Sequence, residues 1–230
     1  YASLFSPAQI LASRPVTLAD LRKLAVDVRG VRNAWIEKVG ELSLKIFHNR
    51  NGASPLLDHQ KNLIQLKDGE GTEPVNLKGL YQVLIETSQV LGVDSAEVVR
   101  NVARRLHAHR PLCMDFESVD VMDAQNIQVR ASIEIGSDGN PEDIYVAILG
   151  KIAACISPAV LFYTLTQRLA AGKRVDEIFD GPMLTQGFID TDELARMERK
   201  TALRVSDFLH EIMDVEGVLM VKYLALSGGV

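Results

Sequence analysis

An internal repeat constrains the fold more than any other feature of this sequence. The segments ADLRKLAVDVRGVRNAWIEKV (19–39) and SDFLHEIMDVEGVLMVKYLAL (206–226) align without a gap, so that DVRGV lies over DVEGV. Each copy has a stretch with the apolar spacing of a helix, then a glycine, then an apolar stretch typical of a strand. Glycine tolerates the positive φ angle that such a turn from helix to strand requires. The repeat therefore predicts two helix–glycine–strand units, with Gly30 and Gly217 as structural turn glycines.

Each copy also contains a strand followed by a helix. The stretch GLYQVLIET (79–87) precedes a helix predicted over 95–109, and NIQVRASIEIG (126–136) precedes a helix that Pro141 opens. This half follows the helix–glycine–strand half in the first copy and precedes it in the second. The predicted fold class is therefore α+β: two related small-sheet units with helices packed on one face, the second unit permuted, plus an inserted helix–loop segment. A chance likeness between the two copies is the alternative.

The predicted domain organisation has three parts. Residues 1–16 form an N-terminal extension, 17–112 the first α+β unit, and 113–230 the second unit, with the inserted helix–loop segment at 158–200. Because the chain begins with Tyr rather than Met, we expect it to be a piece of a longer protein. The other predicted elements are strands at 31–39, 41–47, about 62–66 and 116–136 (one strand, or a pair broken near 123–126), and helices at 158–172, 192–200 and 202–214.

Composition excludes some classes of protein. With 230 residues, 47% of them hydrophobic, the chain is able to bury a sizeable core. A net charge of −5 argues against a nucleic-acid partner, which requires a basic face. No apolar run reaches the roughly 18 residues of a membrane span, so direct membrane insertion is not expected. Cys113 and Cys155 both lie in apolar stretches, which predicts buried free thiols.

The segment DEIFDGPMLTQGFIDTDEL (176–194) is the strongest candidate site, because it places six acidic residues around two glycines and a proline. These acids lack EF-hand spacing and have no paired histidine, so a structural loop is favoured over a metal or catalytic site. In this interpretation Gly181, Pro182 and Gly187 shape the loop. The aromatic and aliphatic side chains then anchor it or contact a partner: Phe179, Leu184 and Phe188.

Other candidate chemistry is weak. In RRLHAHR (104–110), His107 and His109 lie two positions apart on a helix and point in different directions, which suits no shared metal. The apolar surroundings of Cys113 favour an unreactive thiol. No phosphate-binding glycine motif and no nucleophile elbow is present. We therefore predict no catalytic, cofactor-binding or metal-binding residues and no enzyme activity. The alternatives are a metal-dependent or thiol hydrolase using the 176–193 acidic loop or Cys113, and an adaptor domain of an unrelated complex.

Several stretches resemble the baseplate J-like wedge proteins of contractile injection systems. They are GLYQVLIET with the helix after it, HRPLCMDFESVDV, IQVRASIEI, the span from Ser157 to Leu194, and SDFLHEIMDVEGV. The chain is most similar to large wedge subunits of phage-tail-like particles and type VI-like machines of Bacteroidetes and related bacteria. The likeness extends from about Val16 to Leu226, and its most specific part is the pattern around EIFDGPMLTQGFI.

The resemblance implies a structural function. Wedge proteins pair and join into a ring around the central hub, and the ring links to contraction of the sheath. It implies other wedge subunits as partners, either the same chain or a different one, and possibly hub and sheath proteins. It also implies a protein made in the bacterial cytoplasm that becomes part of a particle, which is cytoplasmic, membrane-attached or released.

Overall fold

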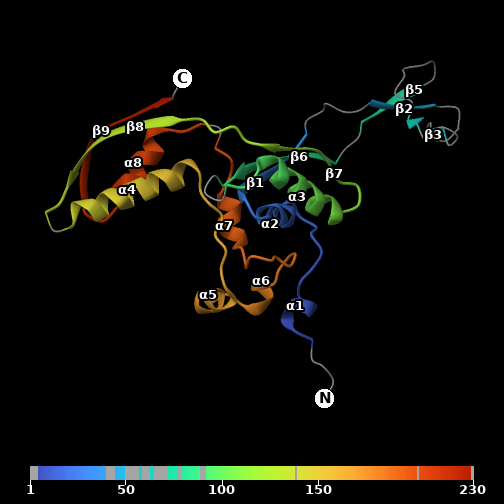
Figure 1. Cartoon of the computed structure of the whole chain (residues 1–230), viewed down its shortest axis with the longest axis horizontal. Coiled ribbons are helices and arrows are strands. Elements are labelled where there is room, and N and C mark those ends of the chain that lie inside the picture. The colour runs from blue at the N-terminus through green and yellow to red at the C-terminus, as the bar shows by residue number, and fades with distance from the viewer. Residues whose placement is uncertain are drawn as a thin grey trace.

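The computed structural model describes residues 5–39, 79–88, 92–137, 139–200 and 202–228, and the backbone of four short strands between residues 45 and 76 (Figure 1). A short helix, α1 (Pro7–Ile10), precedes two α+β units. The first unit contains α2 (Leu18–Val26), β1 (Val31–Lys38), β6 (Leu80–Thr87), α3 (Ser95–Ala108) and β7 (Asp115–Val121). The second contains β8 (Ile127–Ile135), α4 (Pro141–Ile156), α8 (Val205–Met213) and β9 (Val218–Gly228). The segment between α4 and α8 holds α5 (Leu165–Ala170), α6 (Val175–Ile178) and α7 (Thr191–Arg196).

The first unit is a three-stranded sheet with the order β1-β6-β7. β6 runs antiparallel to β1 and parallel to β7, and α2 and α3 pack on one face of the sheet (Figure 1). Val98, Val102 and Leu106 of α3 are fully buried against this core, since their spacing places them on one side of the helix. The remaining strands form two antiparallel two-stranded sheets, β2 (Lys45–Asn49) with β5 (Thr72–Asn76) and β3 (Leu57–Asp58) with β4 (Leu63–Ile64).

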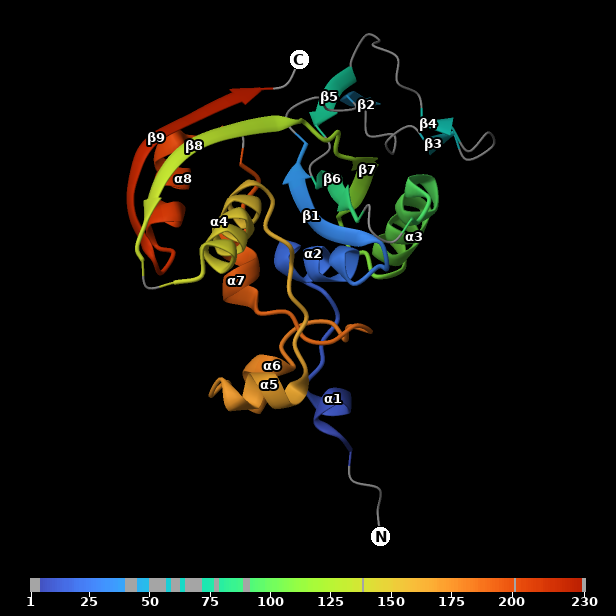
Figure 2. The same cartoon turned by 60° about the vertical axis from the view of Figure 1, so that its left-hand side comes forward.

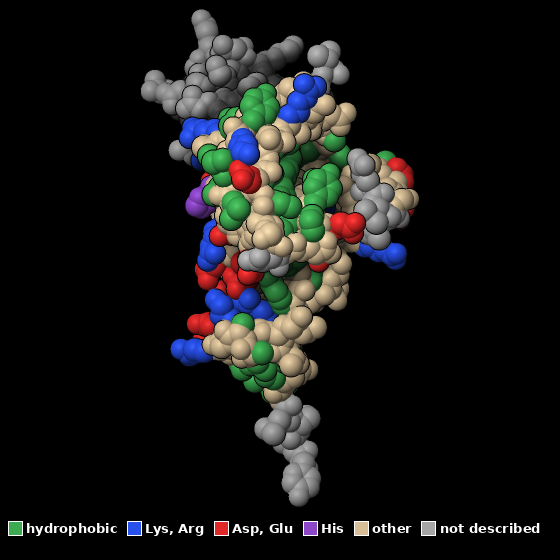
Figure 3. Space-filling model, turned by 90° about the vertical axis from the view of Figure 1, so that its left-hand side faces the viewer, with side chains coloured by type: hydrophobic (Ala, Val, Ile, Leu, Met, Phe, Trp, Pro, Cys, Tyr) green, Lys and Arg blue, Asp and Glu red, His purple; other side chains and the backbone are tan. Residues whose placement is uncertain are grey.

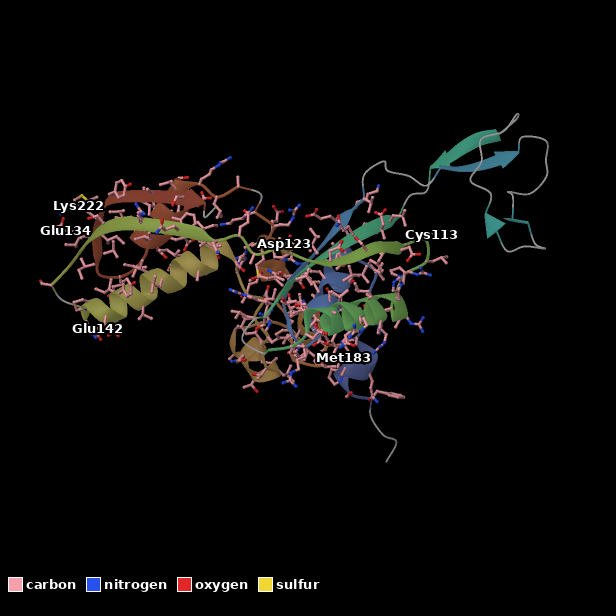
Figure 4. All side chains as sticks on the ribbon, turned by 45° about the horizontal axis from the view of Figure 1, so that its top comes forward. Cys113, Asp123, Glu134, Glu142, Met183 and Lys222 are labelled. Atoms are coloured by element: carbon pink, nitrogen blue, oxygen red, sulfur yellow. The ribbon has the colours of Figure 1, made fainter. Side chains whose placement is uncertain are left out.

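The second unit is a two-stranded antiparallel sheet of β8 and β9, with α4 and α8 on its concave face (Figure 2). Its core is separate from that of the first unit and is centred on Ile144, Ile148, Phe208 and Ile212. On the sheet, Lys222 of β9 forms an ion pair with Glu134 of β8 at 2.9 Å (Figure 4). The α+β class with small sheets is thus confirmed.

The two helix–glycine–strand units share their local geometry. Gly30 and Gly217 both have positive φ, 97° and 92°, immediately before their strands. The backbone N–H of Ser88 donates to the carbonyl of Gly30 at 2.8 Å, and the N–H of Gly136 donates to the carbonyl of Gly217 at 2.9 Å. In both units the antiparallel register shifts at the second residue of the strand after the glycine.

The order of elements in the chain is the one that a permuted second unit would have. The antiparallel pair is β1 with β6 in the first unit and β9 with β8 in the second, and α3 follows β6 as α4 follows β8. The helix–glycine–strand half comes first in one unit and last in the other. A permuted second unit accounts for this order of elements and stays our interpretation of it.

Two predictions about the middle of the chain need correction. β7 pairs with β6, so the change from the first sheet to the second falls at residues 122–126, near Asp123 (Figure 4), rather than at 112/113. The helix predicted over 158–172 is confined to α5, since residues 158–164 run extended along the first unit. Pro158 cannot donate a backbone hydrogen bond, and its carbonyl accepts one from Asn33 of β1 at 3.0 Å, so tertiary contacts replace helical ones.

Other predicted elements agree with the structure to within a few residues. The break near 123–126 separates β7 from β8, and Pro141 opens α4 with Asn140 as the N-cap. The helix predicted over 192–200 ends at Arg196, and the one over 202–214 begins at Val205. Of the strand predicted over 41–47, residues 41–44 lie outside the described residues, and β2 begins at Lys45.

Candidate functional site

The best-defined polar site joins α2 to the segment 157–200, here called the covering segment. At its centre is Asp27, which ends α2 and whose side chain is fully buried. One carboxylate oxygen accepts the backbone N–H groups of Thr185 and Gln186 at 2.9 and 2.8 Å, and the other accepts the Thr185 hydroxyl at 2.9 Å. Arg105 of α3 pairs with the same carboxylate. The buried charge is therefore compensated by both a cation and hydrogen bonds, as burial requires.

Other side chains of α2 and β1 donate hydrogen bonds to backbone carbonyls of the covering segment. Arg22 donates to the carbonyls of Leu194 at 2.8 Å and Met197 at 2.5 Å, and burial lowers its pKa to about 10. Lys23 donates to the carbonyl of Asp180 at 3.4 Å. Trp35 of β1 is half-buried, and its indole N–H donates to the carbonyl of Met197 at 3.1 Å. Side chains of α2 and β1 thus donate to backbone carbonyls of the covering segment at four points.

The residues predicted to shape the 176–190 loop occupy its turns. Gly181 has φ 94° and Gly187 φ 136°, and a Cβ at either position would approach Asp20 or the carbonyl of Tyr163 within 2.8 Å. Pro182, half-buried, follows the first turn. Side chains larger than hydrogen are therefore excluded at both glycines by conformation and by space.

The apolar residues of this loop are engaged within the chain. The Phe179 ring is buried and lies edge-on to the ring of Phe188, with centroids 5.1 Å apart. Phe188 itself is half-buried and bridges to Tyr163 through backbone hydrogen bonds of 2.9 and 2.8 Å. Leu184 packs against the first core, which leaves Met183 (Figure 4), 50% exposed, as the apolar side chain that the loop presents to solvent.

Three acidic residues of this segment, Asp176, Asp190 and Asp192, form ion pairs, and Asp190 also caps a helix. Asp190 caps α7 and pairs with Arg168 and, at 3.7 Å, with Lys173. Burial acts to raise the pKa of Asp190, but hydrogen bonds from the Glu193 N–H and from Arg168 outweigh it and lower the pKa to about 2. Across the described residues, no group of three or more His, Cys, Asp or Glu is arranged to hold a metal ion. This arrangement suits a structural loop.

The remaining candidates are dispersed. His107 lies 3.8 Å from Asp115, which also pairs with Arg110, while His109 contacts the carbonyl of Arg105. Cys155 is buried as predicted, but Cys113 is exposed, so that prediction was wrong for it (Figure 4). Cys113 lies at a turn with φ 64°, where the chain reverses between α3 and β7, and its side chain stays at the surface. No helix within the described part of the chain is both long and apolar enough to span a membrane.

Reasoning from the sequence missed the role of Asp27. The available signal was the repeat itself, in which Asp27 aligns with Asp214. The partners of Asp27 lie 158 and 159 residues away in the chain, at Thr185 and Gln186, so no local pattern could indicate them.

A family model matches the second half of the chain. Residues 123–229 match the family described as Baseplate wedge Pvc12-like domain 3, which spans β8, α4, the covering segment, α8 and β9. The match confirms the resemblance to baseplate wedge proteins of contractile injection systems. No curated protein matches the chain.

A solved structure has the same fold over nearly the whole chain. It is a cryo-EM structure of the anti-feeding prophage baseplate, 6-fold symmetrised, and one of its chains aligns with a TM-score of 0.55 at 20% sequence identity. The alignment covers 98% of this chain but only 36% of the baseplate chain. The chain therefore spans about a third of the length of the relative that it matches, and both units and the covering segment are included in the shared fold.

Proposed function

We propose that this chain is a structural part of a baseplate wedge protein in a contractile, phage-tail-like injection particle. The observation that carries the proposal is the family match over residues 123–229, supported by the fold shared with a chain of the anti-feeding prophage baseplate. In this function the protein contributes to the ring around the hub and links it to sheath contraction through contacts with other wedge subunits, and with hub and sheath proteins. It has no catalytic step, and the particle that holds it is assembled in the bacterial cytoplasm.

The contacts within the chain suit a rigid structural part of a larger assembly. The covering segment ties the two units together, because it joins α4 to α8 while its own side chains and carbonyls bind α2 and β1. Arg199 makes two hydrogen bonds to Glu37 of β1, at 2.7 and 3.0 Å, close to the start of the second unit's last helix. We infer that the loop shaped by Gly181, Pro182 and Gly187 locks this segment in place, with Phe179, Leu184 and Phe188 turned inward and Met183 outward.

Removal of the full-length protein tests the proposal. In the producing bacterium, deletion of its gene should abolish assembled sheathed particles counted by electron microscopy, and re-expression of the intact protein should restore them. Purified particles should contain the protein in a fixed ratio to the sheath, measured by quantitative mass spectrometry. Normal numbers of contractile particles in the deletion strain would refute a wedge function and favour an adaptor or an enzyme.

A further inference from the structure

The second unit repeats the acid–base pair of the first. α2 and α8 have nine residues each, and Asp27 and Asp214 end them at the same position of the repeat. Asp27 pairs with Arg105 of α3, and Asp214 pairs with Lys151 of α4 at 2.7 Å. Arg105 and Lys151 are both the eleventh residue of their helix. The hydrogen bond from Lys151 lowers the pKa of Asp214, which keeps its carboxylate ionised.

The two aspartates differ in what covers them. The side chain of Asp27 has no exposed area, because Thr185 and Gln186 of the covering segment lie on it. The side chain of Asp214 is 66% exposed, and its hydrogen-bond partner on the described residues is Lys151. The carboxylate at this repeat position therefore accepts two backbone N–H groups in the first unit. In the second unit, it is exposed and can still accept hydrogen bonds from a partner.

The groups nearest the Asp214 carboxylate are charged, namely Lys151, Glu211 that shares Lys151, and His210, but apolar side chains are exposed elsewhere on α8 and β9. Leu209, Met213 and Met220 are 41%, 44% and 46% exposed. By the repeat they occupy the places of Arg22, Val26 and Asn33, of which Val26 and Asn33 are fully buried. Arg22 donates to the side chain of Asn33 at 3.0 Å, so Leu209 and Met220, at the matching positions, are expected to be neighbours. Figure 3 views the end of the molecule formed by the second unit and shows hydrophobic side chains at its surface.

From this we propose that Leu209, Met213, Asp214 and Met220, here called the second-unit face, bind an extended segment of a different particle subunit. The inference rests on the proposed function and deepens it. The segment presents consecutive backbone N–H groups to Asp214, as Thr185 and Gln186 do to Asp27, and apolar side chains to Leu209 and Met213. In the first unit, Thr185 and Gln186 show how two consecutive backbone N–H groups reach the carboxylate at this position of the repeat.

A partner chain fits better than the chain's own loop for two reasons. The loop at 185–186 is already committed to Asp27 by four hydrogen bonds to its carboxylate. At the matching positions of the first unit, Arg22 and Asn33 donate to backbone carbonyls of a segment in the same chain. The second-unit face has Leu209 and Met220 in their places. Flexible methionines and an apolar centre with a polar margin are typical of surfaces that bind another protein.

A photo-crosslinker placed in the assembled particle tests the occupant. Leu209 is replaced by p-benzoylphenylalanine in the full-length protein, with the same replacement at Leu112, which is 95% exposed in the first unit, as the matched control. After irradiation of purified particles, mass spectrometry should find residue 209 crosslinked to one segment of a different subunit. Crosslinks to a second copy of this chain, to another part of the same chain, or to no protein would overturn the proposal.

Substitution of apolar residues by charged ones gives a second, independent test of the second-unit face. The double change Leu209→Glu and Met213→Glu should leave the thermal midpoint of the isolated protein unchanged but lower particle numbers roughly tenfold or more, since hot-spot losses exceed the 1.4 kcal/mol that a factor of ten requires. Leu112→Glu should lower them little. If deletion of the gene abolishes particles but the double variant assembles normally, the second-unit face is refuted and the wedge function stands. If deletion has no effect, the wedge function itself fails.

Discussion

Replacement of Asp27 by Ala should destabilise the first unit far more than the same change at the matching Asp214. The Asp27→Ala change leaves Arg105 as a partly buried cation without its carboxylate, and removes the acceptor of the Thr185 and Gln186 N–H groups. Breaking one side of a buried, hydrogen-bonded pair costs about 3–5 kcal/mol. For a chain of this size that corresponds to a fall in thermal midpoint of roughly 6–20 °C.

The assay is thermal unfolding followed by circular dichroism, with limited trypsin digestion as a local probe. In Asp27→Ala the covering segment loses its main attachment, so cleavage after Lys173 or Arg174 should become faster under native conditions. Asp214→Ala is the matched control, since it removes an exposed carboxylate at the same repeat position and should leave both readings close to those of the unchanged protein. Equal shifts for the two variants would refute the claim that tertiary cover, rather than the aspartate itself, sets the contribution to stability.

Three further predictions test local features. Gly30→Ala should destabilise by about 1–2 kcal/mol because its φ is 97°, whereas Gly150→Ala within α4, with open space around it, should stabilise by about 0.5–1 kcal/mol; denaturant titration measures both, and a harmless Gly30→Ala would contradict the turn assignment. Because the pKa of Asp190 is lowered to about 2 from 3.8, its contribution to stability is full above pH about 4 and is lost as pH falls toward 2. The difference in thermal midpoint between the protein and Asp190→Asn should therefore shrink over that window, and a constant difference would contradict it. Cys113 should react with a maleimide in the folded protein and Cys155 should not, so mass spectrometry should show one modification, and two would contradict the burial of Cys155.

Local sequence predicted the units well because their determinants are local. The turn at Gly30 and the one at Gly217 each need a residue that tolerates positive φ, and the helix before each turn has an apolar stripe that packs on the sheet its strand joins. Asp94 and Asn140 cap α3 and α4 through hydrogen bonds to residues two positions away, which is also visible in the sequence. The positions of these helices and turns are therefore set by residues within one or two helical turns in the sequence.

The candidate loop could be predicted only in part. Glycine and proline at 181, 182 and 187 indicated a shaped loop, and the structure places positive φ at both glycines. The sequence suggested Leu184 and Phe188 as partner contacts as well as anchors. An apolar side chain in the sequence is consistent with both, because a buried core and a protein interface favour the same residue types. Only the fold shows that Leu184 packs on the first core and that Phe188 bridges to Tyr163.

The sequence by itself thus determined two helix–glycine–strand units, because turn geometry and apolar periodicity act over a few residues. Tertiary structure alone decided which unit is covered. Thr185 and Gln186, which cover Asp27, come 158 and 159 residues after it in the chain. Residues 158–164 are extended because β1 provides side-chain and backbone hydrogen-bond partners for them. Equivalent aspartates therefore have unequal surroundings, one buried by its own chain and one exposed at the surface.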